Sequence, residues 1–164
     1  MPNREETRNL ETIPVGPLGL IPLPSCAEIG DKINYYLVKW RKERENEHKN
    51  TLSFTGYQKD TFIMEHKLPR FGSGEGKGVI LESVRGDDLY LLVDVCNYSL
   101  TYTVAGHLNH MSPDDHFQDL KRIIAAVEGK ANRITVIMPF LYESRQHKRT
   151  ARESLDCAIA LQEL

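Results

Sequence analysis

The sequence predicts an α/β domain in which helices flank a mostly parallel sheet. Short apolar runs alternate along the chain with longer segments of helical periodicity, and this alternation is typical of parallel strands joined by crossover helices. Two of the runs, 88–95 and 133–141, are apolar over most of their length, as strands buried on both faces are. With 164 residues, the chain is long enough for one domain with a hydrophobic core.

The first strand is predicted in LGLIPLP at 18–24, after a leader rich in proline and glycine. A helix follows, and Ser25 with Glu28 three residues later forms a capping-box pattern at its start. The charged run 41–49 is expected to be the solvated end of this helix. The apolar residues that predict its buried face are Ile29, Ile33, Tyr36, Leu37 and Trp40.

The middle of the chain predicts three more strands, DTFIMEH at 60–66, KGVILES at 77–83 and DLYLLVDV at 88–95. The sequence VRGDD supplies the turn between the last two. Residues 51–57 fit neither a helix nor a strand clearly. These strands would extend the sheet that begins at 18–24.

The most clearly marked element is a helix in SPDDHFQDLKRIIAAVEGK at 112–130. Ser112 is expected to cap it, Pro113 fits its first position, acidic residues fill its first turn, and Gly129 ends it. The apolar strand at 133–141 and a final helix from Ser154 complete the series of elements.

Composition and charge exclude several classes of protein. The net charge of −2 argues against a general nucleic-acid binder, and no apolar run approaches the roughly 20 residues of a membrane span. The first twelve residues are too polar and acidic for a signal peptide. Three scattered cysteines, Cys26, Cys96 and Cys157, form no CxxC pair and favour a reducing compartment. We therefore expect a soluble cytoplasmic protein with no nucleic-acid or membrane partner.

The strongest candidate site is a cationic loop after the strand at 133–141. Its candidate anion-binding residues are Arg145, Lys148, Arg149 and Arg152, with Gln146 and His147 among them. Arginine side chains form paired hydrogen bonds to phosphate oxygens, and cations in a first helical turn would oppose the helix dipole unless an anion is bound. The loop also follows the carboxyl end of a strand, where α/β sheets bind ligands. A solvated helix start and a contact for an acidic protein are the alternatives.

Three other patterns are weaker. FGSGEGKGV at 71–79 fails both glycine-rich phosphate-loop patterns and precedes a strand, so it predicts a flexible turn. Cys96 and Cys157 lie in no nucleophile motif and are expected to be packed small residues. Imidazoles and carboxylates gather in HLNHMSPDDH, which would suit a metal but more often form a polar surface; they are His107, His110, Asp114, Asp115 and His116.

Several segments together resemble the ribose-phosphate pyrophosphokinase (phosphoribosyl pyrophosphate synthetase) family. RFGSGE followed by LESVRGDDLYLL is similar to the R-F-x-[ND]-G-E turn and the E-S-V-R-G-x-D hairpin of that family. The helix at 112–130, the strand after it and the YESRQ loop resemble the family's next elements, and ARESLDCAIALQEL resembles its S-R-x-x-[IL] helix. The chain is thereby identified as the N-terminal half of a divergent member.

The resemblance implies a phosphoribosyltransferase-like (Rossmann-like) fold and the N-terminal half of a two-domain enzyme. It places the domain at 18–164, with 1–17 as an extension, 41–61 as an insertion and a C-terminal domain expected beyond Leu164. The family transfers pyrophosphate from Mg-ATP to ribose 5-phosphate, giving phosphoribosyl pyrophosphate and AMP. ATP and ribose 5-phosphate are therefore the expected partners, and a homo-oligomer with a nucleotide site shared between subunits is implied.

The family's motifs also imply roles for four residues of this chain. Arg145 and Gln146 would hold the nucleotide, whereas Phe71 and Glu75 would contact the adenine of a neighbouring subunit. Ser73 departs from the usual Asn or Asp, which removes one expected hydrogen bond to adenine.

The family's Mg²⁺ ligands, its mobile catalytic loop and its ribose-phosphate loop are expected downstream of these 164 residues. No catalytic or metal residue is therefore predicted here, and the fragment alone is expected to be inactive. The alternative is a non-catalytic regulatory subunit that binds a nucleotide or polyphosphate.

Overall fold

The computed structural model describes residues 14–47 and 56–164, and it confirms an α/β fold around a parallel sheet. Most of the predicted extension and part of the insertion, 1–13 and 48–55, lie outside the described residues. The sheet has the strand order β1-β4-β7, and both pairings are parallel. Its strands are β1 (Leu18–Pro22), β4 (Asp88–Leu92) and β7 (Arg133–Ile137).

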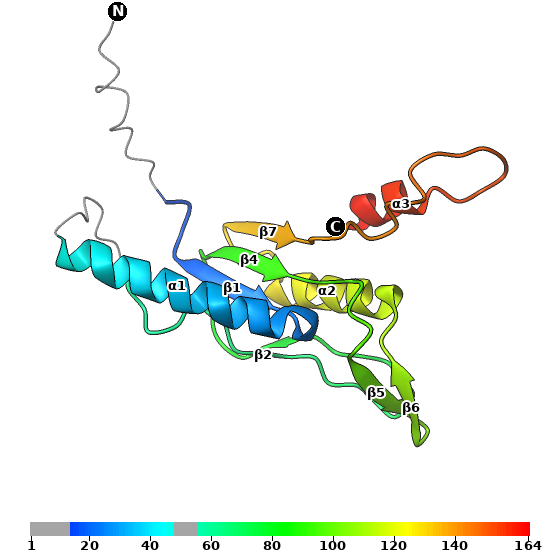
Figure 1. The fold of residues 1–164 in the computed structure, drawn as a ribbon, viewed down its shortest axis with the longest axis horizontal. Coiled ribbons are helices and arrows are strands. Elements are labelled where there is room, and N and C mark those ends of the chain that lie inside the picture. The colour runs from blue at the N-terminus through cyan, green and yellow to red at the C-terminus, as the bar shows by residue number, and fades with distance from the viewer. Residues whose placement is uncertain (1–13, 48–55) are drawn as a thin grey trace, which may run out of the picture.

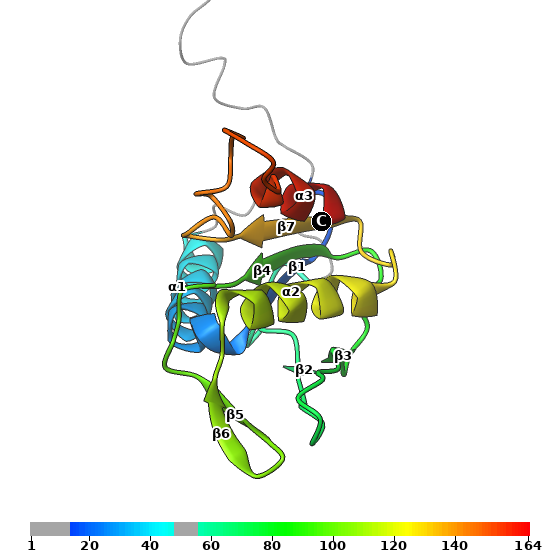
Figure 2. The ribbon, with the colours of Figure 1, turned by 90° about the vertical axis from the view of Figure 1, so that its right-hand side faces the viewer.

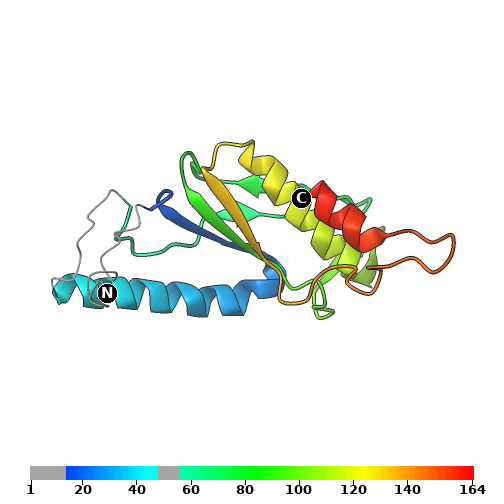
Figure 3. The same cartoon turned by 90° about the horizontal axis from the view of Figure 1, so that it is seen from above.

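The helices lie on the two faces of this sheet (Figure 3). One face packs against α1 and the other against α2, with α3 on the same side as α2 (Figures 2 and 3). A short 3-10 turn, η2, leads from β1 into α1. The bounds are η2 (Pro24–Cys26), α1 (Ala27–Asn46), α2 (Pro113–Val127) and α3 (Asp156–Glu163).

Alternating side chains of the strands build two separate cores. Leu20 and Leu92 pack with Phe62 and with the α1 residues Ile33 and Leu37. The residues next to them in the strands, such as Ile21 and Leu91, point to the opposite face of the sheet, because successive side chains of a strand point to alternate faces. These residues form the second and larger core, between the sheet and α2. It includes the fully buried residues Ile21, Leu89, Leu91, Leu120 and Ile123. None of the described helices is long and apolar enough to span a membrane.

The start of α1 differs from the prediction. Ser25 does not cap the helix, which begins at Ala27 without any side-chain cap. Instead, the Ser25 hydroxyl accepts a hydrogen bond from the backbone N–H of Asp94, 3.0 Å away. A contact made 69 residues along the chain therefore uses the oxygen that the local pattern assigned to the cap.

The buried face of α1 is narrower than predicted. Ile33 and Leu37 pack on the sheet, but Ile29, Tyr36 and Trp40 are about half exposed. A helix of 20 residues is about 30 Å long, whereas a strand of five residues covers about 17 Å. The helix therefore extends beyond the sheet (Figure 1). Ile29, Tyr36 and Trp40 follow one another at i, i+7 and i+11, so they share a helical stripe that is turned away from the stripe of Leu37 and Arg41.

Arg41, the first residue of the charged run predicted to be solvated, is half-buried. Its guanidinium donates a hydrogen bond to the Tyr57 carbonyl and lies over the rings of Tyr57 and Phe62, 4.4 and 4.5 Å from their centroids. Burial lowers the pKa of Arg41. The rest of the predicted run up to Glu47 is exposed, as expected.

Helix α2 has the predicted boundaries. The Ser112 hydroxyl accepts a hydrogen bond from the Asp115 N–H at 3.2 Å, and the Asp115 carboxylate accepts one from the Ser112 N–H at 2.9 Å, which completes a capping box. Pro113 is the first helical residue. The helix ends where Glu128 and Gly129 both take positive φ angles, 53° and 65°.

The remaining strands are shorter than predicted, and one pair was not predicted. The run 60–66 forms one parallel bridge, between Ile63 and Leu20, and 77–83 contributes only two residues to a small antiparallel pair. The run 133–141 leaves the sheet before Pro139, which has no N–H to donate. The small sheets are β2 (His66–Lys67) with β3 (Val79–Ile80), and the unpredicted hairpin of β5 (Thr101–Val104) with β6 (His107–His110).

The two leucines at 120 and 108 give a matched test of this core. Leu120 is fully buried between α2 and the sheet, whereas Leu108 is 69% exposed on the β5–β6 hairpin. We expect Leu120→Ala to lower the free energy of unfolding by about 2–5 kcal/mol through lost packing and a residual cavity. Leu108→Ala should change it by less than about 0.5 kcal/mol. Urea unfolding of both variants measures the difference, and equal losses would contradict this placement of the core.

Candidate functional site

The carboxyl ends of the three parallel strands lie at one edge of the sheet (Figure 1). From β1 the chain passes through α1 to the segment that pairs outside β1, and from β4 it passes through α2 to β7. The two crossovers therefore diverge between β1 and β4. Sheets of this kind bind ligands in the crevice at such a switch point.

Two cavities open along this edge. The one at the switch point has a volume of about 620 Å³, and the one beside it has about 320 Å³. Residues that line the larger cavity include Ser25, Lys32, Asp94, Asn97 and Pro139. Those that line the smaller one include Val95, Cys96, Pro113, Tyr142 and Arg145.

Hydrogen bonds fix the floor of the larger cavity. The Asn97 amide donates to the Ser25 carbonyl at 3.1 Å, and the Cys96 N–H donates to the Asp94 carboxylate at 2.9 Å. Cys96 is exposed here, so its predicted packing is wrong, while Cys157 is buried as predicted. The sequence signal for this floor was only its position directly after two strands.

The cationic loop lies beyond β7 at this edge, between β7 and α3 (Figure 1). Arg145, Lys148, Arg149 and Arg152 are all exposed. In residues 14–47 and 56–164, none of these four cations has a carboxylate within ion-pair distance. Such a loop favours an anion, because its four cations outnumber its two acids, Glu143 and Glu153, and none of the four is paired with a carboxylate in the described residues.

The cations of the loop do not lie in the first turn of α3, as the sequence suggested. Helix α3 begins at Asp156 rather than near Ser154, and its first turn contains an acid. Arg149 and Arg152 therefore precede the helix and do not oppose its dipole. The four unpaired charges remain as the reason to expect an anion.

The loop is attached to the domain at both ends. At its start, the Tyr142 ring stacks on Phe117 with the centroids 4.3 Å apart, and the Tyr142 hydroxyl donates to the Asp114 carboxylate at 2.8 Å. Burial and this hydrogen bond raise the pKa of Tyr142, so the hydroxyl keeps its proton. At its end, the Gln146 carbonyl accepts a hydrogen bond from the Cys157 N–H at 3.3 Å.

Phe71 and Glu75 lie on the turn between β2 and β3, which has the predicted form of a turn leading into a strand. The Phe71 N–H donates to the Glu75 carbonyl at 2.8 Å, and the Ser73 hydroxyl donates to the Glu75 carboxylate at 2.9 Å. The Phe71 side chain is 54% exposed. Ser73, which departs from the family's pattern, thus orients Glu75.

The structure does not bring this turn together with the cationic loop. Across the sheet, perpendicular to the strands, the β2–β3 pair lies on the side of β1, which is one outer strand. The loop that follows β7 lies on the side of β7, which is the other outer strand (Figures 1 and 2). Arg145 and Gln146 are therefore close to each other, and so are Phe71 and Glu75, but the two pairs are separated within one chain.

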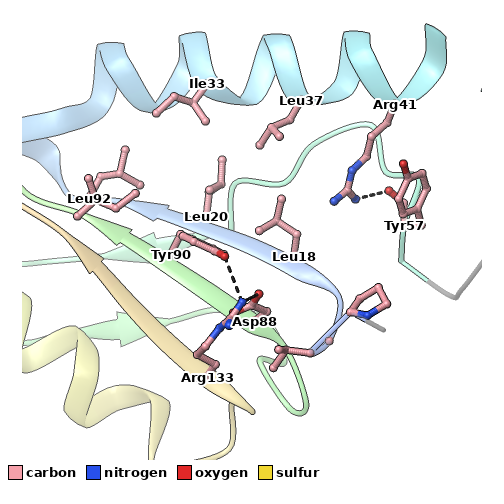
Figure 4. A pocket seen from close by; sticks show the side chains of 14 residues that line it. Leu18, Leu20, Ile33, Leu37, Arg41, Tyr57, Asp88, Tyr90, Leu92 and Arg133 are labelled. Atoms are coloured by element: carbon pink, nitrogen blue, oxygen red, sulfur yellow. Dashed lines mark hydrogen bonds and ion pairs between the residues drawn. The ribbon is translucent and has the colours of Figure 1, made fainter. Parts of the chain in front are cut away.

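A third cavity, of about 600 Å³, lies between α1 and the sheet (Figure 4). Most of its lining is apolar, and its charged groups have partners. The Arg133 guanidinium donates to Asp88 at 2.7 Å and to the Tyr90 hydroxyl at 3.3 Å. This cavity also reaches the amino ends of the strands, so it suits a polyphosphate less well than the cationic edge does.

Two of the three histidines of HLNHMSPDDH, His110 and His116, have structural partners. His110 bonds to the Tyr98 carbonyl at 2.8 Å and stacks on the Tyr98 ring, and His116 bonds to the Asn97 carbonyl at 2.7 Å. Among the described residues, no group of three or more His, Cys, Asp or Glu side chains is placed to hold a metal ion.

Comparison with protein families decides the relationship of the chain. The model of the N-terminal domain of ribose phosphate pyrophosphokinase matches residues 20–164. The chain belongs to this family. The match includes the β2–β3 turn and the cationic loop, so both candidate contact regions of this pyrophosphokinase domain lie within the matched residues.

A solved structure agrees with this assignment at the level of the fold. Phosphoribosylpyrophosphate synthetase from Mycobacterium smegmatis is 21% identical and superposes with a TM-score of 0.63. The alignment covers 90% of this chain but 38% of that chain, so the pyrophosphokinase domain described here spans less than half the length of that protein. No curated protein matches the chain.

The capping box of α2, which borders the smaller cavity, predicts a pH dependence of stability. Burial tends to raise the pKa of Asp115, but hydrogen bonds from Ser112, the charge of Arg70 and the Tyr102 hydroxyl outweigh it and lower the pKa below its usual 3.8. The folded state therefore holds this carboxylate ionised more strongly than the unfolded state does. Its stabilisation is complete above pH 3.8 and is lost as the pH falls through the lowered pKa.

We expect Asp115→Asn to lower the free energy of unfolding by about 1 kcal/mol at pH 7 and to flatten its decline below about pH 4. Asp31→Asn, which changes an exposed carboxylate on α1, is the control. Urea unfolding between about pH 2 and 7 gives the curves. If the Asp115→Asn curve ran parallel to that of the unmodified protein, the proposed role of this carboxylate would be wrong.

Proposed function

We propose that the chain forms the nucleotide-binding half of an enzyme that transfers pyrophosphate from Mg-ATP to ribose 5-phosphate, giving phosphoribosyl pyrophosphate and AMP. The observation that carries the proposal is the cationic loop: a family-matched segment with four exposed cations that lack a carboxylate partner among the described residues. The loop lies at the carboxyl edge of the sheet, where this architecture binds ligands.

The chemistry explains why a domain of this kind needs cations more than it needs a nucleophile. The 1-hydroxyl oxygen of the sugar bonds to the β-phosphorus of ATP, the bond from that phosphorus to the α–β bridging oxygen breaks, and the hydroxyl gives up its proton. No protein atom enters the bonds that form or break. The contribution expected of the protein is therefore to orient the reactants and to neutralise charge on the phosphates.

Arg145 and Gln146 are the residues proposed to hold the nucleotide. Arg145 lines the cavity of about 320 Å³, and its guanidinium can form paired hydrogen bonds with phosphate oxygens. Lys148, Arg149 and Arg152 would add positive charge around the same phosphates. Mg²⁺ would arrive with ATP as part of the substrate; the described residues form no site for it, and we assign them no step through the metal.

The separation of the two candidate regions supports a site shared between copies of the chain. Phe71 and Glu75 lie beyond one edge of the sheet and the cationic loop beyond the other (Figure 2). A nucleotide that contacts both regions would therefore take the loop from one copy and the turn from a second copy. The separation of the regions supports a homo-oligomer. We further propose that it is cytoplasmic, that it binds ATP and ribose 5-phosphate, and that it has no nucleic-acid or membrane partner.

Replacement of Arg145 tests the proposal most directly. In the full native polypeptide, we expect Arg145→Ala to raise the Kd for Mg-ATP about 10- to 100-fold, the loss of one hydrogen-bonded charge pair. Isothermal titration calorimetry measures the Kd, and AMP formation with ribose 5-phosphate measures turnover.

Arg133→Ala is the matched control, because it removes an arginine that pairs with Asp88 and lies outside the cationic loop. Its Kd should stay within twofold of the unmodified protein. An unchanged Kd for Arg145→Ala would overturn the nucleotide role of the loop. If the unmodified polypeptide bound ATP but formed no AMP, the non-catalytic regulatory subunit would be the better description.

A further inference from the structure

The turn that carries Phe71 and Glu75 is fixed to the domain by the residue directly before it. The Arg70 guanidinium donates to the Asp119 carboxylate of α2 at 2.7 Å and lies 4.9 Å from the centroid of the Tyr102 ring on β5. The Arg70 side chain is only 12% exposed, whereas that of its neighbour Phe71 is 54% exposed. An exposed aromatic residue thus lies beside a partly buried arginine that is bonded to α2.

Asp119, the partner of Arg70, is only 3% exposed. A buried carboxylate is costly unless it is paired. Arg122, one turn along α2, donates to its other oxygen at 2.6 Å, so two arginines share this carboxylate. The pair with Arg70 is therefore held from both sides and links the turn to α2, a helix with a large buried face.

Two glycines allow the turn to approach α2 closely. A Cβ added at Gly78 would lie 2.6 Å from the backbone oxygen of Arg122, and one added at Gly76 would lie 2.6 Å from the Arg122 guanidinium. A larger residue at Gly78 would push the turn away from the helix backbone, and one at Gly76 would displace the Arg122 guanidinium. Glycine-rich composition at 71–79, which suggested a flexible loop, serves close packing here instead.

The turn also has its own internal hydrogen bonds. The Phe71 N–H donates to the Glu75 carbonyl, the Gly74 N–H donates to the Phe71 carbonyl, and the Lys77 N–H donates to the Pro69 carbonyl, at 2.8 to 3.0 Å. The tip of the β5–β6 hairpin adds one more contact, from the Ala105 N–H to the Gly72 carbonyl at 3.2 Å. An anchored and internally bonded turn holds its exposed side chains in one arrangement.

We propose that Arg70 and Asp119 are a positioning pair that fixes the turn 71–75, so that Phe71 and Glu75 are already arranged for a nucleotide before it binds. The inference rests on the proposed function, in which this turn contacts the adenine of a neighbouring copy's nucleotide. Side chains that are ordered beforehand do not lose their conformational freedom on binding. Arg70 itself faces α2 and is not expected to touch the nucleotide.

Hydrogen exchange tests the positioning without any nucleotide. In the full native polypeptide, we expect Arg70→Ala to speed amide exchange in 69–78 at least tenfold and to leave the parallel sheet unchanged. Asp119→Asn, which keeps the side-chain volume, should act in the same region, and Arg133→Ala should not. Unchanged exchange of the turn in both Arg70→Ala and Asp119→Asn would overturn the inference.

A double-mutant cycle connects the pair to binding. We expect Arg70→Ala and Glu75→Ala each to raise the Kd for Mg-ATP about 5- to 10-fold. The double variant should raise it by clearly less than the product of the two factors, because only Phe71 is left for Arg70 to position once Glu75 is removed. Effects of residues that act through the same contact are not additive, whereas general destabilisation would multiply the two factors. Thermal unfolding of each variant verifies that it is folded during the titration.

The outcomes separate the two proposals. If Glu75→Ala alone leaves the Kd unchanged, the proposed adenine contact fails and the binding role of the pair falls with it. If Glu75→Ala weakens binding but the Arg70→Ala effect multiplies with it, only the positioning role is wrong. A non-additive cycle together with faster exchange at 69–78 supports both.

Discussion

Everything at the candidate site depends on the parallel pairing of β4 on both of its sides. Leu89 lies opposite Gly19 on β1 and opposite Ile134 on β7, so the three strands run in one direction and end together. An antiparallel neighbour would have sent its loop to the far edge. Because all three ends coincide, the segments after β1, β4 and β7 share one edge, and the two cavities open among them.

Helix α2 contacts both candidate regions, the cationic loop and the β2–β3 turn, and holds each of them against the domain. Its first turns hold the base of the cationic loop through Asp114 and Phe117, which bind and stack on Tyr142. Asp119, further along, holds the β2–β3 turn through Arg70. The carboxylates of α2 are thus used in internal bonds, while the cations of the loop are left unpaired among the described residues. A chain with net charge −2 can in this way present a locally positive edge.

The sequence predicted correctly those features that depend on residues close together in the chain. The capping box, first-position proline and terminal glycine of α2 act within a few residues, and the helix has the predicted boundaries. The Ser25 cap failed because a tertiary hydrogen bond to Asp94 uses the same hydroxyl. The β5–β6 hairpin was not predicted, because two strands of four residues give little periodicity. In the structure, Ala105 and Gly106 form its tight turn, and both take positive φ angles. Arg70 escaped notice since its partner lies 49 residues away.

The sequence and the structure give different reasons to expect an anion at the cationic loop. Its charges were expected to oppose a helix dipole, yet α3 begins only at Asp156. What favours an anion is that these cations extend beyond the β7 edge, away from the acids of α2 that bind Tyr142 and Arg70. The same separation places the aromatic turn beyond the opposite edge. Under the proposed function, one copy would give its loop to one nucleotide and its turn to another, with α2 as the rigid connection between the two contacts.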